Sequence, residues 1–171
     1  MLRPIANVLT AVRLAAVVPF TVLLATAGHH PSWPAAVVFA AASFTDFLDG
    51  YLARHADRPS RFGRIADPLA DRLLINMALV LLWYQGRLPW WLAVPVLLRD
   101  IWLAAFFRAR GIGSRVAVNM TGKTATALIM LSLVLLMVTT APWPQVLFGA
   151  GLVLSLAAAA RYTRHPREVQ T

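Results

Sequence analysis

The chain contains no cysteine and few charged residues. Of its 171 residues, only 13% are Asp, Glu, Lys or Arg. The absence of cysteine excludes disulfide bonds and thiolate metal sites, and it leaves the redox compartment undetermined. The apolar fraction is 59%, above the roughly 45–50% of ordinary soluble domains. A soluble globule of this size has too little interior to hide so much apolar surface, so the composition favours a protein that lies in lipid.

Acidic residues are the scarcest charged group. There are 7 of them against 16 Lys and Arg, which gives a formal net charge of +9. Such a charge can indicate nucleic-acid binding. Here, however, the basic residues form short clusters between long apolar runs, as juxtamembrane charges do. The distribution predicts contact with membrane lipids and phosphate-bearing substrates, and no nucleic-acid partner.

Six apolar segments are long enough to cross a bilayer, which requires about 20 mainly apolar residues. They cover approximately residues 5–27, 33–52, 63–84, 89–107, 116–138 and 144–160. Turn residues such as His30-Pro31 separate most of them. The first segment lacks a signal-peptide cleavage pattern, so we keep it in the fold. The sequence therefore predicts an all-α integral membrane protein with six transmembrane helices in one domain, residues 1–171.

Lys and Arg are distributed unevenly between the two ends of these segments. One side carries most of the arginines, whereas the other carries only Arg87. Because basic loops stay in the cytoplasm, we expect a multi-pass protein of the cell (inner or plasma) membrane with both termini cytoplasmic. Five tryptophans fall near the opposite ends, where an interfacial aromatic belt is expected: Trp33, Trp83, Trp90, Trp91 and Trp143.

Five of the seven acidic residues lie between positions 46 and 71, and four of these, all except Asp57, lie at or near membrane depth. A carboxylate in lipid is costly unless it is paired, bound to metal or facing water. Asp46 and Asp49 are three residues apart, and Asp67 and Asp71 are four apart, so each pair shares one face of a helix. The short connection makes the two helices antiparallel neighbours. All four carboxylates can then converge on one pocket at the cytoplasmic boundary.

Carboxylate oxygens without His or Cys suit Mg²⁺ or Mn²⁺. Two such ions about 4 Å apart would fit a phosphoryl-type displacement. One alternative is a structural network of ion pairs between these aspartates and nearby arginines, since buried charges are usually paired. Another is a transporter whose intramembrane aspartates bind cations or protons, although the sequence shows no discontinuous helices or paired half-repeats.

The residues around the aspartates form a longer motif. It reads D-F-L-D-G-Y-L-A-R from Asp46 to Arg54, and after eight residues Gly63, Asp67 and Asp71 follow at intervals of four. This resembles the signature of the CDP-alcohol phosphatidyltransferase family, D-x-x-D-G-x-x-A-R followed after eight or nine residues by G-x-x-x-D-x-x-x-D. All eight fixed positions match. A chance match at eight positions is far less probable than a chance match to a short motif.

The resemblance implies a homodimeric enzyme that moves a phosphatidyl group from a CDP-lipid to an alcohol. It implies that Asp46, Asp49 and Asp67 bind metal, and that Asp71 shares the metal site and acts as the base for the acceptor hydroxyl. It also implies a CDP-lipid pocket lined by Asp46 and four further motif positions: Gly50, Ala53, Arg54 and Gly63. Small residues let a nucleotide approach the backbone, and an arginine can donate two hydrogen bonds to a phosphate. The metals would neutralise the diphosphate and stabilise CMP as the leaving group.

Further segments resemble the branch that contains phosphatidylglycerophosphate synthases and eukaryotic-type cardiolipin synthases. Asn7-Val8-Leu9-Thr10 with Arg13 resembles the N-L-T-x-x-R opening of the bacterial synthases. Alternatively, Asn7 or Thr10 caps a helix.

Leu98-Arg99-Asp100 and Gly122-Lys123-Thr124-Ala125 resemble elements of the same branch. They place Arg99 and Lys123 inside apolar segments, where these cations could hold the phosphate of the acceptor; Arg108 is a further candidate. The alternative for Arg99 is an ion pair with an aspartate on a facing helix, or snorkelling to the membrane surface.

We expect the reaction to be transfer of the phosphatidyl group of CDP-diacylglycerol to sn-glycerol 3-phosphate, which releases CMP and forms phosphatidylglycerophosphate. Phosphatidylglycerol as the acceptor, giving cardiolipin, is the alternative, because both acceptors carry a phosphate and a glycerol hydroxyl. Direct attack by the hydroxyl and a covalent enzyme intermediate both fit the same carboxylates.

The sixth apolar segment carries a row of small residues, Gly151, Ser155 and Ala159. Such a row permits close approach of helices, within or between protomers. We expect it to pack within the protomer.

Overall fold

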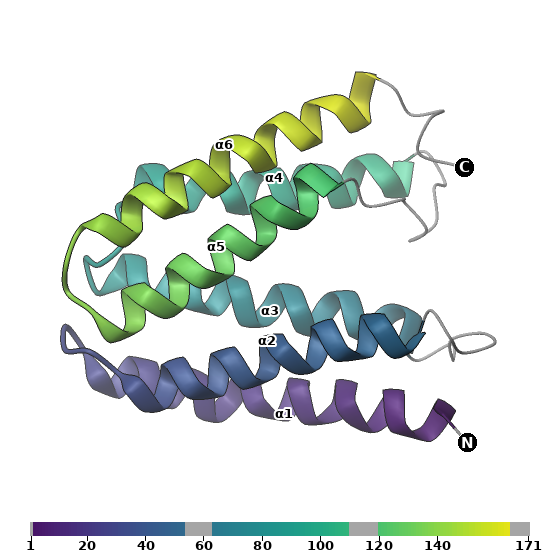
Figure 1. Cartoon of the computed structure of the whole chain (residues 1–171), viewed down its shortest axis with the longest axis horizontal. Coiled ribbons are helices and arrows are strands. Elements are labelled where there is room, and N and C mark those ends of the chain that lie inside the picture. The colour runs from purple at the N-terminus through teal and green to yellow at the C-terminus, as the bar shows by residue number, and fades with distance from the viewer. Residues whose placement is uncertain (1, 54–62, 110–119, 165–171) are drawn as a thin grey trace. The chain divides into compact units, whose positions relative to one another are not determined.

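The computed structural model describes residues 2–53, 63–109 and 120–164, and these residues form six helices and no strand (Figure 1). The helices are α1 (Leu2–Ala27), α2 (Trp33–Ala53), α3 (Gly63–Tyr84), α4 (Trp90–Ala109), α5 (Met120–Val138) and α6 (Trp143–Arg164). Side chains are described for residues 11–45, 72–103, 105–106 and 120–160. Each helix coincides with one predicted apolar segment, so the all-α class is confirmed for the part of the chain described.

Within the described part of the chain, two helical segments are long and apolar enough to cross a membrane, Met120–Val138 and Trp143–Ala160. Shorter apolar stretches lie within α1, α2 and α3: Ala11–Ala27, Trp33–Thr45 and Arg72–Tyr84. The helices are consistent with a membrane protein. The six predicted crossings stay a prediction.

The helices fall into two compact units. The first contains residues 1–87 and 137–140, and the second contains residues 88–136 and 141–171. In the first unit, α1 packs against both α2 and α3, and α2 also contacts α3. The rings of Phe20 on α1 and Phe39 on α2 are fully buried, with centroids 5.5 Å apart. Because all three helices share this packing, α1 supports the two helices that carry the signature.

In the second unit, α4 packs against α6, and α6 also approaches α5 at Gly151. A Cβ atom at Gly151 would lie 2.9 Å from Ile129 Cγ1 and 3.2 Å from the carbonyl oxygen of Ala125. Ser155 and Ala159, the other members of the small-residue row, are buried. The predicted packing within the protomer is therefore confirmed at Gly151, where only a glycine allows the two backbones to come this close.

Local signals set the ends of several helices. Gly28 follows α1 and Gly86 follows α3 by two residues, with φ of 57° and 69°, the left-handed conformation common after helix C-termini. Ser32 caps α2, because its hydroxyl accepts a hydrogen bond from the Ala35 amide at 3.4 Å. By contrast, α1 begins at Leu2, so Asn7 and Thr10 lie inside it. The alternative interpretation that one of them caps a helix is wrong, because a cap precedes the first turn.

Polar side chains join the loops at one end of the first unit. Gln85 donates from Nε2 to the carbonyl oxygen of Leu24 at 2.7 Å, and the backbone carbonyl oxygen of Gln85 lies 2.7 Å from His29 Nδ1. Arg87 donates to the carbonyl oxygens of His30 and Thr139. Burial lowers the pKa of Arg87 below its ordinary value, because a buried cation loses hydration. These bonds satisfy carbonyls at or beyond helix C-termini, which have no partner within the helix.

Candidate active site

The signature lies at the opposite end of the first unit, on α2 and α3. Four of its positions occupy the last turns of α2 and three occupy the first turns of α3: Asp46, Asp49, Gly50, Ala53, Gly63, Asp67 and Asp71. Arg54 lies outside the described residues, as do the side chains of the other seven positions. The structure thus places the backbone of the predicted site, and its metal contacts stay a prediction.

The helix register sets the aspartates at two matched depths. Asp49 lies four residues before the end of α2, and Asp67 lies four residues after the start of α3, so each is about 6 Å from its helix end. Asp46 and Asp71 lie seven and eight residues from the same ends, or about 10–12 Å. The α2 C-terminus and the α3 N-terminus lie at the same end of the first unit (Figure 1). This register is compatible with four carboxylates that meet at one place.

The donor set of the signature fits a hard divalent cation. It consists of four carboxylates, with oxygen donors and no His or Cys, and Mg²⁺ and Mn²⁺ prefer such ligands. Among the side chains that the structure describes, which exclude these four, no group of three or more His, Cys, Asp or Glu residues gathers. The signature therefore stays the candidate metal site of the chain.

A buried arginine shares the first unit with the signature. Arg13 lies near the middle of α1, and its side chain is only 2% exposed. A guanidinium is rarely buried unless anionic or carbonyl groups surround it. In the sequence, Arg13 is distinguished only by the N-L-T-x-x-R resemblance. Its burial on the helix that supports α2 and α3 is a tertiary feature that no local pattern predicts.

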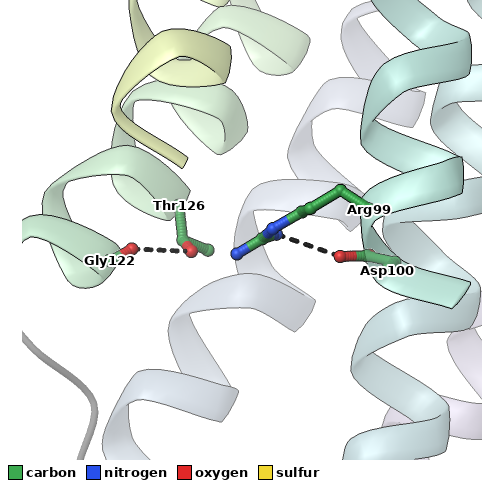
Figure 2. Close-up of polar contacts among 4 residues, drawn as sticks. All are labelled: Arg99, Asp100, Gly122 and Thr126. Carbon is green, nitrogen blue, oxygen red and sulfur yellow. Dashed lines mark hydrogen bonds and ion pairs between the residues drawn. The ribbon is translucent and has the colours of Figure 1, made fainter. Parts of the chain in front are cut away.

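In the second unit, Arg99 forms an ion pair with Asp100. Arg99 Nη1 lies 2.9 Å from Asp100 Oδ1, and the two side chains are 18% and 13% exposed. The alternative predicted for Arg99, an ion pair with an aspartate on a facing helix, is therefore wrong about the partner, which is the next residue of α4. In Figure 2 the guanidinium extends from α4 toward Thr126 of α5, whose hydroxyl donates to the carbonyl oxygen of Gly122 at 3.0 Å.

The other candidates for acceptor binding lie at helix ends. Lys123 is exposed in the first turn of α5. Arg108 is the penultimate residue of α4, and its side chain lies outside those described. Arg108 follows Arg99 by nine residues, about 13.5 Å along the axis and half a turn around it. These two positions therefore do not form a compact pair of cations on α4.

The chain is similar to known proteins over most of its length. The sequence profile of the CDP-alcohol phosphatidyltransferase family matches residues 3–158. The chain is 42% identical over 100 residues to the probable phosphatidylglycerophosphate synthase of Mycobacterium tuberculosis (strain H37Rv), a match that covers 57% of this chain and 48% of that protein. It therefore spans about half the length of this relative.

Two further relatives carry the name CDP-diacylglycerol–glycerol-3-phosphate 3-phosphatidyltransferase. The protein from Bacillus subtilis (strain 168) is 34% identical over 114 residues, covering 66% of this chain and 59% of the relative. The protein from Escherichia coli (strain K12) is 33% identical over 138 residues, and the match covers 75% of each chain.

Proposed function

Since the chain belongs to the CDP-alcohol phosphatidyltransferase family, we propose that it transfers the phosphatidyl group of CDP-diacylglycerol to sn-glycerol 3-phosphate. The products are CMP and phosphatidylglycerophosphate. The complete signature on the adjoining ends of α2 and α3 carries this proposal. The acceptor is taken from the names of the relatives, which contain glycerol 3-phosphate or phosphatidylglycerophosphate.

Enzymes of this family generally depend on divalent metal ions. Asp46, Asp49, Asp67 and Asp71 would hold Mg²⁺ or Mn²⁺, as two ions. The support is the oxygen-only donor set and the matched depths of the four positions on α2 and α3. When bound, such ions neutralise the diphosphate and stabilise the charge that develops on the leaving CMP.

In the proposed reaction, the acceptor hydroxyl oxygen attacks the phosphorus atom that bears the diacylglycerol. Asp71 takes the hydroxyl proton, and the bond from that phosphorus to the CMP oxygen breaks. Four motif positions line the CDP-lipid site together with Asp46: Gly50, Ala53, Arg54 and Gly63. Arg54 donates to a phosphate oxygen, and the small residues leave space for the nucleotide beside the backbone.

We place the phosphate of the acceptor against the cations of the second unit, Arg99 and Lys123, with Arg108 as a further candidate. Arg99 has the strongest support. Its Nε is buried and has no hydrogen-bond partner among the described residues. A planar guanidinium with donors to spare matches a phosphate better than a lysine does.

The lipid substrate places this chemistry at a membrane. We propose six crossings of the cell (inner or plasma) membrane, with the active site and both termini cytoplasmic, and a homodimer as the resemblance implies. The exposure of the five predicted belt residues supports this arrangement, because soluble proteins rarely expose so many tryptophans: Trp33, Trp83, Trp90, Trp91 and Trp143. Because the chain belongs to a phosphatidyltransferase family, we prefer the enzyme hypothesis to the transporter hypothesis.

The test is product formation by the purified chain in detergent with Mg²⁺ and CDP-diacylglycerol. Glycerol 3-phosphate and phosphatidylglycerol are offered in separate reactions, and reactions with EDTA or without acceptor serve as controls. Phosphatidylglycerophosphate in the first reaction is the expected result. Cardiolipin in the second reaction alone would establish the alternative acceptor, and CMP release with neither would contradict both acceptors while keeping the family chemistry.

A further inference from the structure

Asp100 lies outside the signature, yet it contacts Arg99, the cation that we propose to bind the phosphate of the acceptor. Its Oδ1 accepts a hydrogen bond from Arg99 Nη1 at 2.9 Å, with both side chains mostly buried. Neighbouring residues on a helix do not face each other. The contact therefore requires the Arg99 side chain to turn sideways along α4, and this turn fixes the direction in which its remaining donors point.

The ion pair uses only part of the guanidinium. Arginine carries five N–H donors in a rigid planar fork, and the hydrogen bond to Asp100 engages Nη1 alone. Nε is buried without a hydrogen-bond partner in the described part of the chain. Figure 2 shows the guanidinium extending toward Thr126, away from the α4 backbone. A buried donor without an acceptor is costly, and an anionic ligand beside Nε would remove that cost.

An arginine in an apolar helix has a competing position. Its long side chain can snorkel so that the charge reaches the membrane surface, because a charge inside the bilayer is unfavourable. Arg99 lies near the middle of α4, nine residues after Trp90 and ten before Ala109. An oxygen atom of Asp100 that accepts a hydrogen bond from Nη1 keeps the guanidinium at this depth.

We propose that Asp100 is a positioning residue, which holds Arg99 in the orientation that binds the phosphate of the acceptor. This inference rests on the proposed function, in which Arg99 contacts that phosphate. Asp100 affects the acceptor through Arg99. Its own negative charge would repel the acceptor, so the position of its oxygen atom, and not its charge, is what favours binding.

Position and charge can be separated by two substitutions. Asp100→Asn removes the charge but keeps an oxygen that can accept from Nη1 at nearly the same place. Asp100→Glu keeps the charge but moves the oxygens by one methylene group. A positioning role predicts that Asp100→Glu weakens acceptor binding and Asp100→Asn does not. A role in charge neutralisation predicts the reverse.

The experiment measures steady-state kinetics of the full chain in detergent, with glycerol 3-phosphate and CDP-diacylglycerol varied separately. We expect Asp100→Glu to raise KM for glycerol 3-phosphate about tenfold, the effect of one charge-assisted hydrogen bond. Asp100→Asn should stay within about threefold of the wild type, because its oxygen still accepts a hydrogen bond. KM for CDP-diacylglycerol should not change in either variant. In an Arg99→Gln background, Asp100→Glu should add nothing, since the two residues act as a unit.

Ser132→Ala is the matched control, because it removes another buried polar group of the second unit, whose hydroxyl donates to the Ile129 carbonyl at 2.7 Å. It should leave every kinetic constant unchanged. If Asp100→Glu does not fold, Asp100→Ala replaces it, since it also removes the oxygen that Asp100→Asn keeps. If Asp100→Glu or Asp100→Ala turns over glycerol 3-phosphate at the wild-type rate with unchanged KM, the inference about Asp100 is overturned. The proposed function would not be affected by that result. A wild-type chain without such turnover would contradict the proposed function and remove the premise of the inference.

Discussion

Arg87 donates a hydrogen bond from Nη2 to the carbonyl oxygen of Thr139 at 2.8 Å, across 52 residues of sequence. The same guanidinium donates from Nη1 to the carbonyl oxygen of His30 at 3.1 Å. One side chain from the loop after α3 therefore joins the loop after α1 to the loop after α5, all within the first unit. These contacts lie at the end of the unit opposite to the signature, so they affect stability rather than chemistry.

Arg87→Leu should destabilise the folded chain by about 2–4 kcal/mol, because two hydrogen bonds from a charged donor are lost and two carbonyls lose their partner. The measurement is the midpoint of thermal unfolding in detergent. His30→Ala is the control and should have a much smaller effect, because Arg87 binds the backbone of His30 and not its imidazole. Equal losses in the two variants would contradict the role given to the guanidinium.

Gly151→Ala and Gly149→Ala form a matched pair on α6. A Cβ at Gly151 would lie 3.1 Å from the Ile129 amide nitrogen and 3.2 Å from the Ala125 carbonyl oxygen, both backbone atoms that cannot move aside. We expect a loss of about 1–3 kcal/mol in unfolding free energy. A Cβ at Gly149 would meet only Leu92 Cδ2 at 3.9 Å, so this variant should be neutral or gain up to about 1 kcal/mol in helix propensity. Unfolding of both variants side by side checks the difference, and a stable Gly151→Ala would argue against the close approach of α5 and α6.

Asp71→Asn should abolish turnover and spare binding of the CDP-lipid. An amide keeps the shape of the side chain but cannot take the proton of the acceptor hydroxyl. CMP release measures turnover, and calorimetric titration with CDP-diacylglycerol in detergent measures binding. Full activity in this variant would exclude Asp71 as the base.

Asp49→Ala should weaken the Mg²⁺ response and the binding of CDP-diacylglycerol together, because Asp49 would hold a metal ion that would neutralise the diphosphate. Titration of activity with Mg²⁺ at several CDP-diacylglycerol concentrations measures both effects. Asp57→Ala, an acidic residue of the same region outside the signature, is the control. A wild-type Mg²⁺ response in Asp49→Ala would remove this residue from the proposed metal site.

The sequence by itself determined where the helices lie and to which family the chain belongs. Apolar runs are local, and so are the residues that end them, such as Gly28 and Ser32, which explains why the predicted segments agree with α1 to α6. The signature is also a property of sequence spacing, and the family profile matches residues 3–158 on that basis.

Only the tertiary structure decided which partners the polar residues choose. The sequence showed Arg87 as the one basic residue on its side, whereas its acceptors lie 57 and 52 residues away. From the sequence, the alternative partner of Arg99 was an aspartate on a facing helix, whereas in the structure Arg99 pairs with Asp100 on the same helix. The small-residue row allowed Gly151 to pack within the protomer or against another protomer, and in the structure Gly151 packs against α5 of the same chain. The physical reason is the same in each case: helix formation depends on neighbours within a few residues, whereas burial, hydrogen bonding and close packing depend on segments that only folding brings together.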